Sequence, residues 1–206
     1  MKKCFIFGSA EMEDIPVISA EAGDVFLSAD GGLRHMRRLG LTPDYLIGDF
    51  DSLEGELPEE IPVERYPSEK DDTDTALAVK KGLTLGCEAF YLYGCLGGSL
   101  SHTVANFQLL IALAKQGRQA VLVGDGTRVY GVSDGSMTFG ADEAGKISVY
   151  SFSGRSEGVT LEGLKYPLKN AVLTNDFPLG ASNEFLGKPS RIAVEKGDLL
   201  LILEKF

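Results

Sequence analysis

The chain has 206 residues, of which 44% are hydrophobic and 24% charged, a composition typical of a folded globular protein. Its formal net charge of −10 argues against a protein that grips nucleic acid or an anionic membrane through a basic surface. No apolar run approaches the roughly 20 residues of a membrane span, and acidic residues soon follow the short apolar start, so we expect neither a span nor an export signal. Three scattered cysteines without a Cys-x-x-Cys pair predict buried thiols, a cytoplasmic protein and no zinc site.

The first 125 residues alternate short apolar runs with helix-like stretches. This rhythm is typical of an α/β domain with a mainly parallel, open sheet. Apolar residues at helical spacing predict one helix from Asp74 toward Gly86 and a second from Ser101 toward Gly117. The expected strands are Cys4–Phe7, Val25–Leu27, Tyr45–Ile47, Val63–Arg65, Ala89–Tyr93 and Ala120–Val123.

From about Thr127 the pattern changes to short apolar runs separated by Gly, Asp, Asn and Pro. Such spacing predicts a smaller all-β domain. We place the boundary in the turn-forming cluster Gly124-Asp125-Gly126, which gives an α/β domain over residues 1–126 and an all-β domain over residues 127–206. The expected strands of the second domain are Lys146–Phe152, Gly158–Glu162, Arg191–Glu195 and Leu199–Leu203.

Two carboxylates, Asp49 and Asp51, follow the third expected strand, and the acidic segment Lys70–Asp74 comes about twenty residues later. In an extended chain the two side chains share one face, about 6.5 to 7 Å apart. They repel each other unless a cation lies between them, and a hard Mg²⁺ or Mn²⁺ ion with open positions for phosphate oxygens suits this role. Helix capping is the alternative for the second segment, but it does not require three acids in four residues.

Other polar loops also follow expected strands, and loops of this kind meet at the carboxyl ends of an open α/β sheet. Ser28–Gly32 follows the second strand, although Asp30-Gly31-Gly32 equally suits a plain turn before a helix. The glycine loop Gly94–Ser99 precedes a helix, so its backbone N–H groups suit an anion. Its spacing fits neither a P-loop nor a dinucleotide fingerprint.

Taken together, ADGG, GDFDS, KDDTD, a GGxxxH segment, GLKYPL and SNE resemble the thiamine pyrophosphokinase family, in matching order along nearly the whole chain. The resemblance implies transfer of the terminal pyrophosphoryl group of ATP to the hydroxyl of thiamine, giving thiamine diphosphate and AMP. It also implies Mg²⁺ as cofactor, a C-terminal β-sandwich, and a homodimer with thiamine sites between its subunits.

Carried over to this chain, the resemblance assigns three groups of residues. The metal-binding and catalytic group contains Asp49, Asp51 and Asp74, with Asp72 as a helper ligand. The base that accepts the thiamine proton is left open between Asp72 and Asp74. Thiamine binding falls to Tyr166, Ser182 and Asn183, although ordinary packing is the alternative for the tyrosine. Nucleotide binding falls to Asp30, Gly31, Lys70, Gly97, Gly98 and His102.

One loop departs from the family pattern. The family usually continues Gly-Gly-Arg-x-Asp-His, whereas this chain has Ser99 and Ser101 at the arginine and aspartate positions. Ser99 lacks the planar fork of donors with which arginine clamps phosphate, and Ser101 lacks a carboxylate for metal. A non-catalytic or substrate-shifted homologue that binds nucleotide or thiamine therefore stays open as an alternative.

A phosphatase resembling the haloacid dehalogenase family is the second alternative. Asp49-Phe50-Asp51 would supply its nucleophile and acid, and Gly124-Asp125-Gly126 its late metal loop. Against it, Thr127-Arg128-Val129 follows where that loop normally has another acid, and the aspartate pair follows the third expected strand instead of the first.

Overall fold

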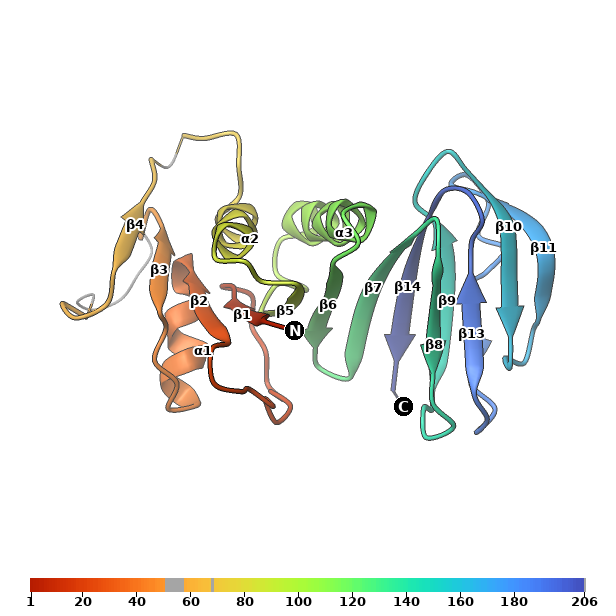
Figure 1. Cartoon of the computed structure of the whole chain (residues 1–206), viewed down its shortest axis with the longest axis horizontal. Coiled ribbons are helices and arrows are strands. Elements are labelled where there is room, and N and C mark those ends of the chain that lie inside the picture. Colours follow the sequence, from red (N-terminus) through yellow and green to blue (C-terminus); the bar gives the residue numbers. More distant parts are fainter. Residues whose placement is uncertain (51–57, 68, 206) are drawn as a thin grey trace. The chain divides into compact units, whose positions relative to one another are not determined.

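The computed structural model describes residues 1–50, 58–67 and 69–205. The chain folds into two compact units, and Figure 1 labels most of their elements. The first unit contains Met1–Asn106 and Arg118–Asp125, and the second contains Phe107–Gly117 and Gly126–Phe206. The division therefore falls within helix α3 (Leu100–Lys115).

The first unit is an open sheet with strand order β6-β5-β1-β2-β3-β4, and each neighbouring pair is parallel (Figure 1). The predicted α/β class with a mainly parallel sheet is confirmed. The strands are β1 (Lys3–Phe7), β2 (Val25–Ala29), β3 (Tyr45–Gly48), β4 (Val63–Arg65), β5 (Ala89–Tyr93) and β6 (Gln119–Gly124). Besides α3, the helical elements are the 3-10 turn η1 (Asp30–Gly32), α1 (Leu33–Arg38) and α2 (Asp74–Thr84).

Helices α1 and α2 cover opposite faces of this sheet. Consecutive residues of a strand point to opposite faces, and β3 shows the consequence. The Lys81 ammonium of α2 lies 3.9 Å from the centre of the Tyr45 ring, whereas the next residue, Leu46, packs with Leu33 of α1. A sheet covered on both faces needs apolar residues on both, which explains the continuous apolar runs in its strands.

The core of the first unit contains a row of aromatic rings across neighbouring strands. The ring of Phe5 stacks on Phe26 and on Tyr91, with ring centroids 5.0 and 5.1 Å apart.

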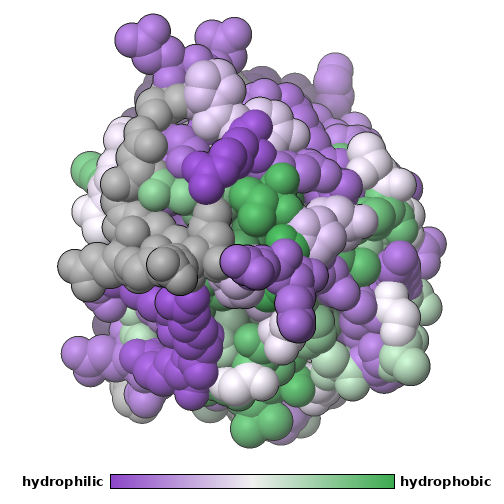
Figure 2. Space-filling model, turned by 90° about the vertical axis from the view of Figure 1, so that its left-hand side faces the viewer, coloured by the Kyte–Doolittle hydropathy of each residue, from purple (hydrophilic) through white to green (hydrophobic). Residues whose placement is uncertain are grey.

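Outside the core, the face presented in Figure 2 is mainly hydrophilic, with some hydrophobic residues near its centre. None of the described helices is long and apolar enough to cross a membrane. The predicted burial of the cysteine thiols is confirmed, since each is free and buried: Cys4, Cys87 and Cys95.

The second unit holds antiparallel strands in the orders β12-β9-β14-β7 and β11-β10-β13-β8. Buried residues of both groups, among them Val149, Leu161 and Leu201, form one hydrophobic cluster. The predicted all-β sandwich is confirmed. Its strands are β7 (Thr127–Ser133), β8 (Ser136–Phe139), β9 (Lys146–Ser151), β10 (Arg155–Glu162), β11 (Leu168–Thr174), β12 (Asn183–Glu184), β13 (Ser190–Ala193) and β14 (Asp198–Glu204).

Candidate functional site

The carboxyl ends of the parallel strands border a cavity of ≈ 610 Å³. The strand order reverses direction between β1 and β5, and ligands of open α/β sheets bind at such a switch point. The loops after β1, β2, β3 and β5 line the cavity, as does the segment before α2. Its lining includes Asp30, Asp49, Lys70, Asp72, Asp74, the glycine-loop residues Gly97 and Gly98, and His102 of α3. Gly31, next to Asp30 in η1, is not among the described lining residues.

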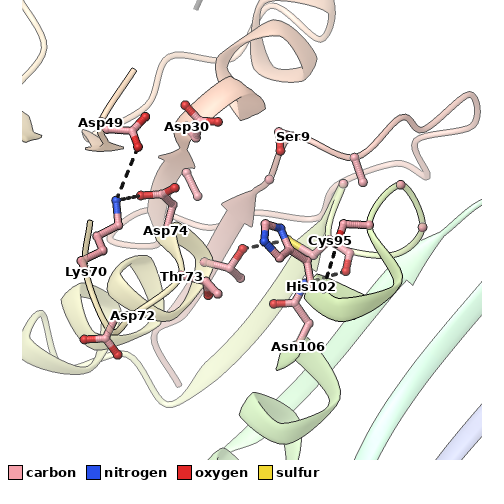
Figure 3. Close-up of a pocket in the computed structure, with 18 of the residues that line it drawn as sticks. Ser9, Asp30, Asp49, Lys70, Asp72, Thr73, Asp74, Cys95, His102 and Asn106 are labelled. Atoms are coloured by element: carbon pink, nitrogen blue, oxygen red, sulfur yellow. Dashed lines mark hydrogen bonds and ion pairs between the residues drawn. The ribbon is translucent and has the colours of Figure 1, made fainter. Parts of the chain in front are cut away.

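A lysine joins two of the predicted carboxylates. Figure 3 shows Lys70 pointing at Asp74 and Asp49, and its Nζ lies 2.8 Å from Asp74 Oδ1 and 3.9 Å from Asp49 Oδ2. The three side chains are only 13%, 24% and 23% exposed, for Lys70, Asp74 and Asp49 respectively. Partial burial reduces screening by water, so the Lys70 ammonium stabilises each of the two carboxylates more strongly than it would at an open surface.

Gly48, at the end of β3, lets these groups approach one another. Its φ of 149° is a backbone conformation that residues with a side chain rarely adopt. A Cβ atom at this position would lie 3.3 Å from Asp74 Oδ1 and 3.2 Å from the Asp30 Cα atom. The absence of a side chain therefore brings the Asp30 backbone and the Asp74 carboxylate to the same strand end.

The start of α2 fixes Asp74 and directs Asp72 elsewhere. Thr73 is the N-cap, and its Oγ1 accepts the backbone N–H of Ala76 at 3.2 Å. Asp74 follows in the first turn, where its negative charge also suits the helix dipole. Asp72 binds Lys80 Nζ at 2.6 Å, so the structure engages this carboxylate with a lysine of α2 although the residue borders the cavity.

The glycine loop is held in place by the helix that follows it. Asn106 of α3 is buried, and its Nδ2 donates a hydrogen bond to the Cys95 carbonyl at 2.7 Å (Figure 3). Gly97 and Gly98 have φ values of 87° and 63°, a left-handed conformation that favours glycine. The Gly97 N–H donates to Thr103 Oγ1 at 3.1 Å, so a second helix residue also fixes the loop.

The two serines that depart from the family pattern form a local cap. Ser99 Oγ accepts the His102 backbone N–H at 3.4 Å, and it lies 2.8 Å from Ser101 Oγ. Both serines and His102 are exposed. The two hydroxyls thus bind each other at the start of α3, where the family pattern has opposite charges.

Cys95 lines the cavity but is no nucleophile at neutral pH. Burial raises the pKa of its thiol to about 12, and this outweighs the lowering by the Thr75 hydroxyl. The thiol is therefore protonated, and thiolate is the reactive form of cysteine. The chemistry available to the cavity is that of carboxylates, an ammonium group and backbone N–H donors.

The carboxylates suit a hard cation in ligand chemistry, because Mg²⁺ prefers oxygen donors and Asp49 and Asp74 already share the positive charge of Lys70. Over the described part of the chain, no group of three or more His, Cys, Asp or Glu side chains is arranged to hold a metal. Asp51, the third predicted ligand, lies outside the described residues.

The predicted thiamine-binding residues lie together in the second unit. Asn183 is 2% exposed, and its side chain accepts the Tyr166 N–H at 2.9 Å and donates to the Tyr166 carbonyl at 2.7 Å. Tyr166 itself is 56% exposed. Ser182 has a φ of 56° and donates its backbone N–H to Ser148 Oγ at 3.1 Å. The buried amide thus holds the backbone of a loop whose aromatic residue faces solvent.

Sequence reasoning gave no role to several polar residues that line the cavity, among them Ser9, Thr73 and Asn106. Ser9 follows the first predicted strand, so its place at a strand end was a usable signal. Asn106 interrupts the apolar pattern of α3, and a buried polar residue of this kind needs a hydrogen-bond partner. Thr73 precedes a predicted helix and has the residue type of an N-cap.

Two sequence profiles match the chain. The profile "Thiamin pyrophosphokinase, catalytic domain" matches residues 19–122, and "Thiamin pyrophosphokinase, vitamin B1 binding domain" matches residues 137–199. The thiamine pyrophosphokinase of Bacillus subtilis (strain 168) is 29% identical over 184 residues, which are 86% of each chain.

Solved structures resemble the chain over its whole length. The crystal structure of thiamine pyrophosphokinase from Bacillus subtilis superposes with a TM-score of 0.89 at 26% identity, covering 100% of both chains. A thiamin pyrophosphokinase family protein from Enterococcus faecalis gives a TM-score of 0.83 at 27% identity, again covering 100% of both chains.

Proposed function

The chain belongs to the thiamin pyrophosphokinase family, and from this premise we propose how its residues transfer the pyrophosphoryl group of ATP to the hydroxyl of thiamine. The products are AMP and thiamine diphosphate. The proposed roles of the residues depend on one observation. Asp49, Lys70 and Asp74 lie together at the carboxyl ends of parallel strands, beside a cavity large enough for a small ligand.

The cavity of the first unit is the proposed ATP site. Lys70 binds phosphate oxygens, and the Gly97–Gly98 loop lies against the same anion at the start of α3, with the Gly98 N–H as donor because the Gly97 N–H binds Thr103 Oγ1. Asp30, Gly31 and His102 complete the proposed nucleotide contacts. Asp49, Asp51 and Asp74 would hold Mg²⁺, with Asp72 as helper. The bound ion would neutralise phosphate charge.

The reaction is an in-line displacement at the β-phosphorus of ATP. The thiamine hydroxyl oxygen forms a bond to this phosphorus while the bond to the oxygen shared with the α-phosphorus breaks, and AMP leaves. The hydroxyl proton passes to a carboxylate, for which Asp74 and Asp72 are the two candidates; each forms an ion pair with a lysine, Lys70 and Lys80 respectively. Positioning and charge neutralisation supply most of the catalysis in such transfers.

The thiamine contacts proposed for the second unit centre on Tyr166. Its exposed ring suits stacking or a cation–π contact with a cationic thiazolium. The Ser182 hydroxyl is assigned a hydrogen bond to the pyrimidine. Asn183 uses its amide on the Tyr166 backbone, so we assign it the role of presenting this loop.

We further propose that the chain forms a homodimer in the cytoplasm. Exposed apolar side chains of the second unit, Phe177 at 64% and Leu179 at 49%, support a covered surface there. Free, buried cysteines support a reducing compartment. The family matches do not favour a haloacid-dehalogenase-like phosphatase or a non-catalytic binder.

The test is to incubate the protein with ATP, Mg²⁺ and thiamine and to measure AMP and thiamine diphosphate together. We expect equimolar products that depend on thiamine, and their loss in Asp49→Asn, which removes one charge without changing shape. Asp142→Asn makes the same change at an exposed residue of the second unit and serves as the matched control. Phosphate release without AMP would contradict the proposed reaction, and full turnover in Asp49→Asn would contradict the role of that carboxylate.

A further inference from the structure

A short segment after β1, residues 9–14, forms one wall of the cavity without being a strand or a helix. Ser9 and Ala10 line the cavity directly. A Cβ atom on Gly31 would lie 3.2 Å from Ser9 Cβ, and one on Gly98 would lie 3.8 Å from Ala10 Cβ. The wall therefore contacts both the η1 turn and the glycine loop, at the point where the strand order reverses.

Three side chains of α1 donate hydrogen bonds to carbonyl groups of this segment. Arg34 Nη2 donates to the Ser9 carbonyl, His35 Nε2 to the Ala10 carbonyl at 2.9 Å, and Arg38 Nη2 to the Met12 carbonyl at 2.6 Å. Because a carbonyl oxygen only accepts hydrogen bonds, Nε2 of His35 carries the hydrogen. Arg34 also forms an ion pair of 2.6 Å with Glu11 of the same segment.

The N–H groups of the segment are fixed from other directions. The Ala10 N–H donates to the Gly94 carbonyl at 2.8 Å, and Asp125 Oδ1 accepts the N–H groups of Glu13 and Asp14 at 2.9 and 2.8 Å. An irregular segment without such bonds gains conformational freedom at every residue. The donors of α1 therefore keep the cavity wall in one conformation.

Helix α1 is itself anchored in the core, which makes it a firm support. Leu33 is 1% exposed, Met36 is 0% exposed and His35 is 2% exposed. A binding site whose wall is rigid before the ligand arrives loses less entropy on binding than a mobile one.

We propose that Arg34, His35 and Arg38 are positioning residues for the nucleoside triphosphate, because they fix the Ser9–Ala10 wall against which it binds. None of them lines the cavity in the described part of the chain. They act through the backbone of residues 9–13 and leave the thiamine contacts unaffected. The inference rests on the proposed function, because it takes the cavity to be the ATP site.

The experiment compares His35→Leu and Arg38→Gln with wild type by KM for ATP, KM for thiamine, kcat and melting temperature. Equilibrium dialysis of ATP gives the affinity without turnover, and hydrogen exchange reports on residues 9–14. In each variant we expect KM and Kd for ATP to rise about tenfold, the ratio produced by about 1.4 kcal/mol. KM for thiamine and kcat stay within about twofold, while residues 9–14 exchange faster.

Two matched variants separate positioning from general damage. His35→Gln keeps an N–H donor at the ε position and restores the affinity for ATP. Arg37→Gln also removes a cation from α1, but Arg37 lines a different cavity. We expect this variant to bind ATP with unchanged affinity. If His35→Leu does not fold, Arg38→Gln still tests the inference. Arg38 is exposed, so its substitution should leave the fold intact.

Two results would overturn the inference. One is unchanged affinity for ATP despite faster exchange of residues 9–14. The other is a variant in which kcat and melting temperature fall while KM rises for both ATP and thiamine. That result would mark a purely structural role. A wild-type protein that makes no thiamine diphosphate would instead refute the proposed function, and the dialysis would still decide the inference.

Discussion

The two candidate sites use polar side chains in opposite ways. In the first unit, Lys70, Asp49 and Asp74 direct their charges toward one another beside the cavity. In the second unit, the polar Asn183 is buried and holds the backbone of Tyr166, and the aromatic ring is what solvent meets. The first arrangement suits charge neutralisation, and the second suits presentation of an apolar surface. Substitutions in the two units should therefore affect different kinetic constants.

Asp74→Asn should have the largest effect and should act on turnover. We expect kcat to fall at least about 100-fold, because a charge at the reacting phosphate is lost. Stability should also fall, through loss of an acid in the first turn of α2, worth about 0.3 to 1 kcal/mol, and through loss of the ion pair with Lys70. Steady-state kinetics and thermal unfolding measure the two effects, with Glu69→Gln at an exposed neighbour of Lys70 as control. An active Asp74→Asn enzyme would erase the contrast between the sites.

Tyr166→Leu should act on thiamine alone. We expect KM for thiamine to rise about tenfold with KM for ATP unchanged, because the leucine cannot stack on or attract a cationic ring. Tyr166→Phe keeps the aromatic face and should stay close to wild type. If leucine and phenylalanine behave alike, the exposed ring is not a thiamine contact.

Ser101→Asp should strengthen Mg²⁺ binding in the first unit. An added carboxylate near the cavity should lower the Mg²⁺ concentration for half-maximal activity by about fivefold, which corresponds to about 1 kcal/mol of Coulomb energy. Ser101→Asn has the same size without the charge and controls for lost contact with Ser99 Oγ. Identical Mg²⁺ dependence in both variants would show that position 101 lies too far from the ion.

Acid should weaken the first unit through His35, the smallest of the expected effects. Burial lowers the pKa of His35 below its ordinary value of 6.5, and Arg34 and Arg38 lower it further, against opposing effects of the Ala10 carbonyl and Glu11. Below pH 6.5 the unfolded chain then binds a proton that the folded chain does not, so stability present above this pH is lost as the pH falls.

Melting curves between about pH 5 and 7.5 measure this loss, since that range brackets the ordinary histidine pKa. Wild type should lose melting temperature toward acid pH more steeply than His35→Gln, by about 2 to 4 °C for each kcal/mol. His102→Gln, at an exposed histidine, serves as the control. Parallel curves for all three proteins would remove His35 as the source of acid sensitivity.

The parallel sheet was readable from the sequence because both of its faces are buried. Its strands appear as continuous apolar runs, and β4 (Val63–Arg65) and β5 (Ala89–Tyr93) have the predicted bounds. In the second unit, the strands without a prediction are β7 (Thr127–Ser133), β8 (Ser136–Phe139), β11 (Leu168–Thr174) and β12 (Asn183–Glu184). β8, β11 and β12 lie at the ends of their strand orders, and half-exposed edge strands tolerate polar residues that hide the pattern.

The site was only partly readable, because spacing indicates strand ends but not side-chain partners. Carboxylates that follow parallel strands must share an edge, which predicted the setting of Asp49 and Asp74. Nothing in the spacing indicates that Asp72 binds Lys80, or that Asn183 is used on the Tyr166 backbone. His35 belongs to no motif, and its contact with Ala10 depends on how α1 packs on the sheet.

The crowding at Gly48 has a consequence for how this gene can change. Any substitution of this glycine introduces a side chain, which would press on the Asp30 backbone and the Asp74 carboxylate together. One such mutation would disturb two strand ends at once, and no second mutation at either aspartate would relieve the backbone conformation. In cells that depend on supplied thiamine and on this enzyme for thiamine diphosphate, we expect residue 48 to stay glycine among survivors while exposed residues nearby vary.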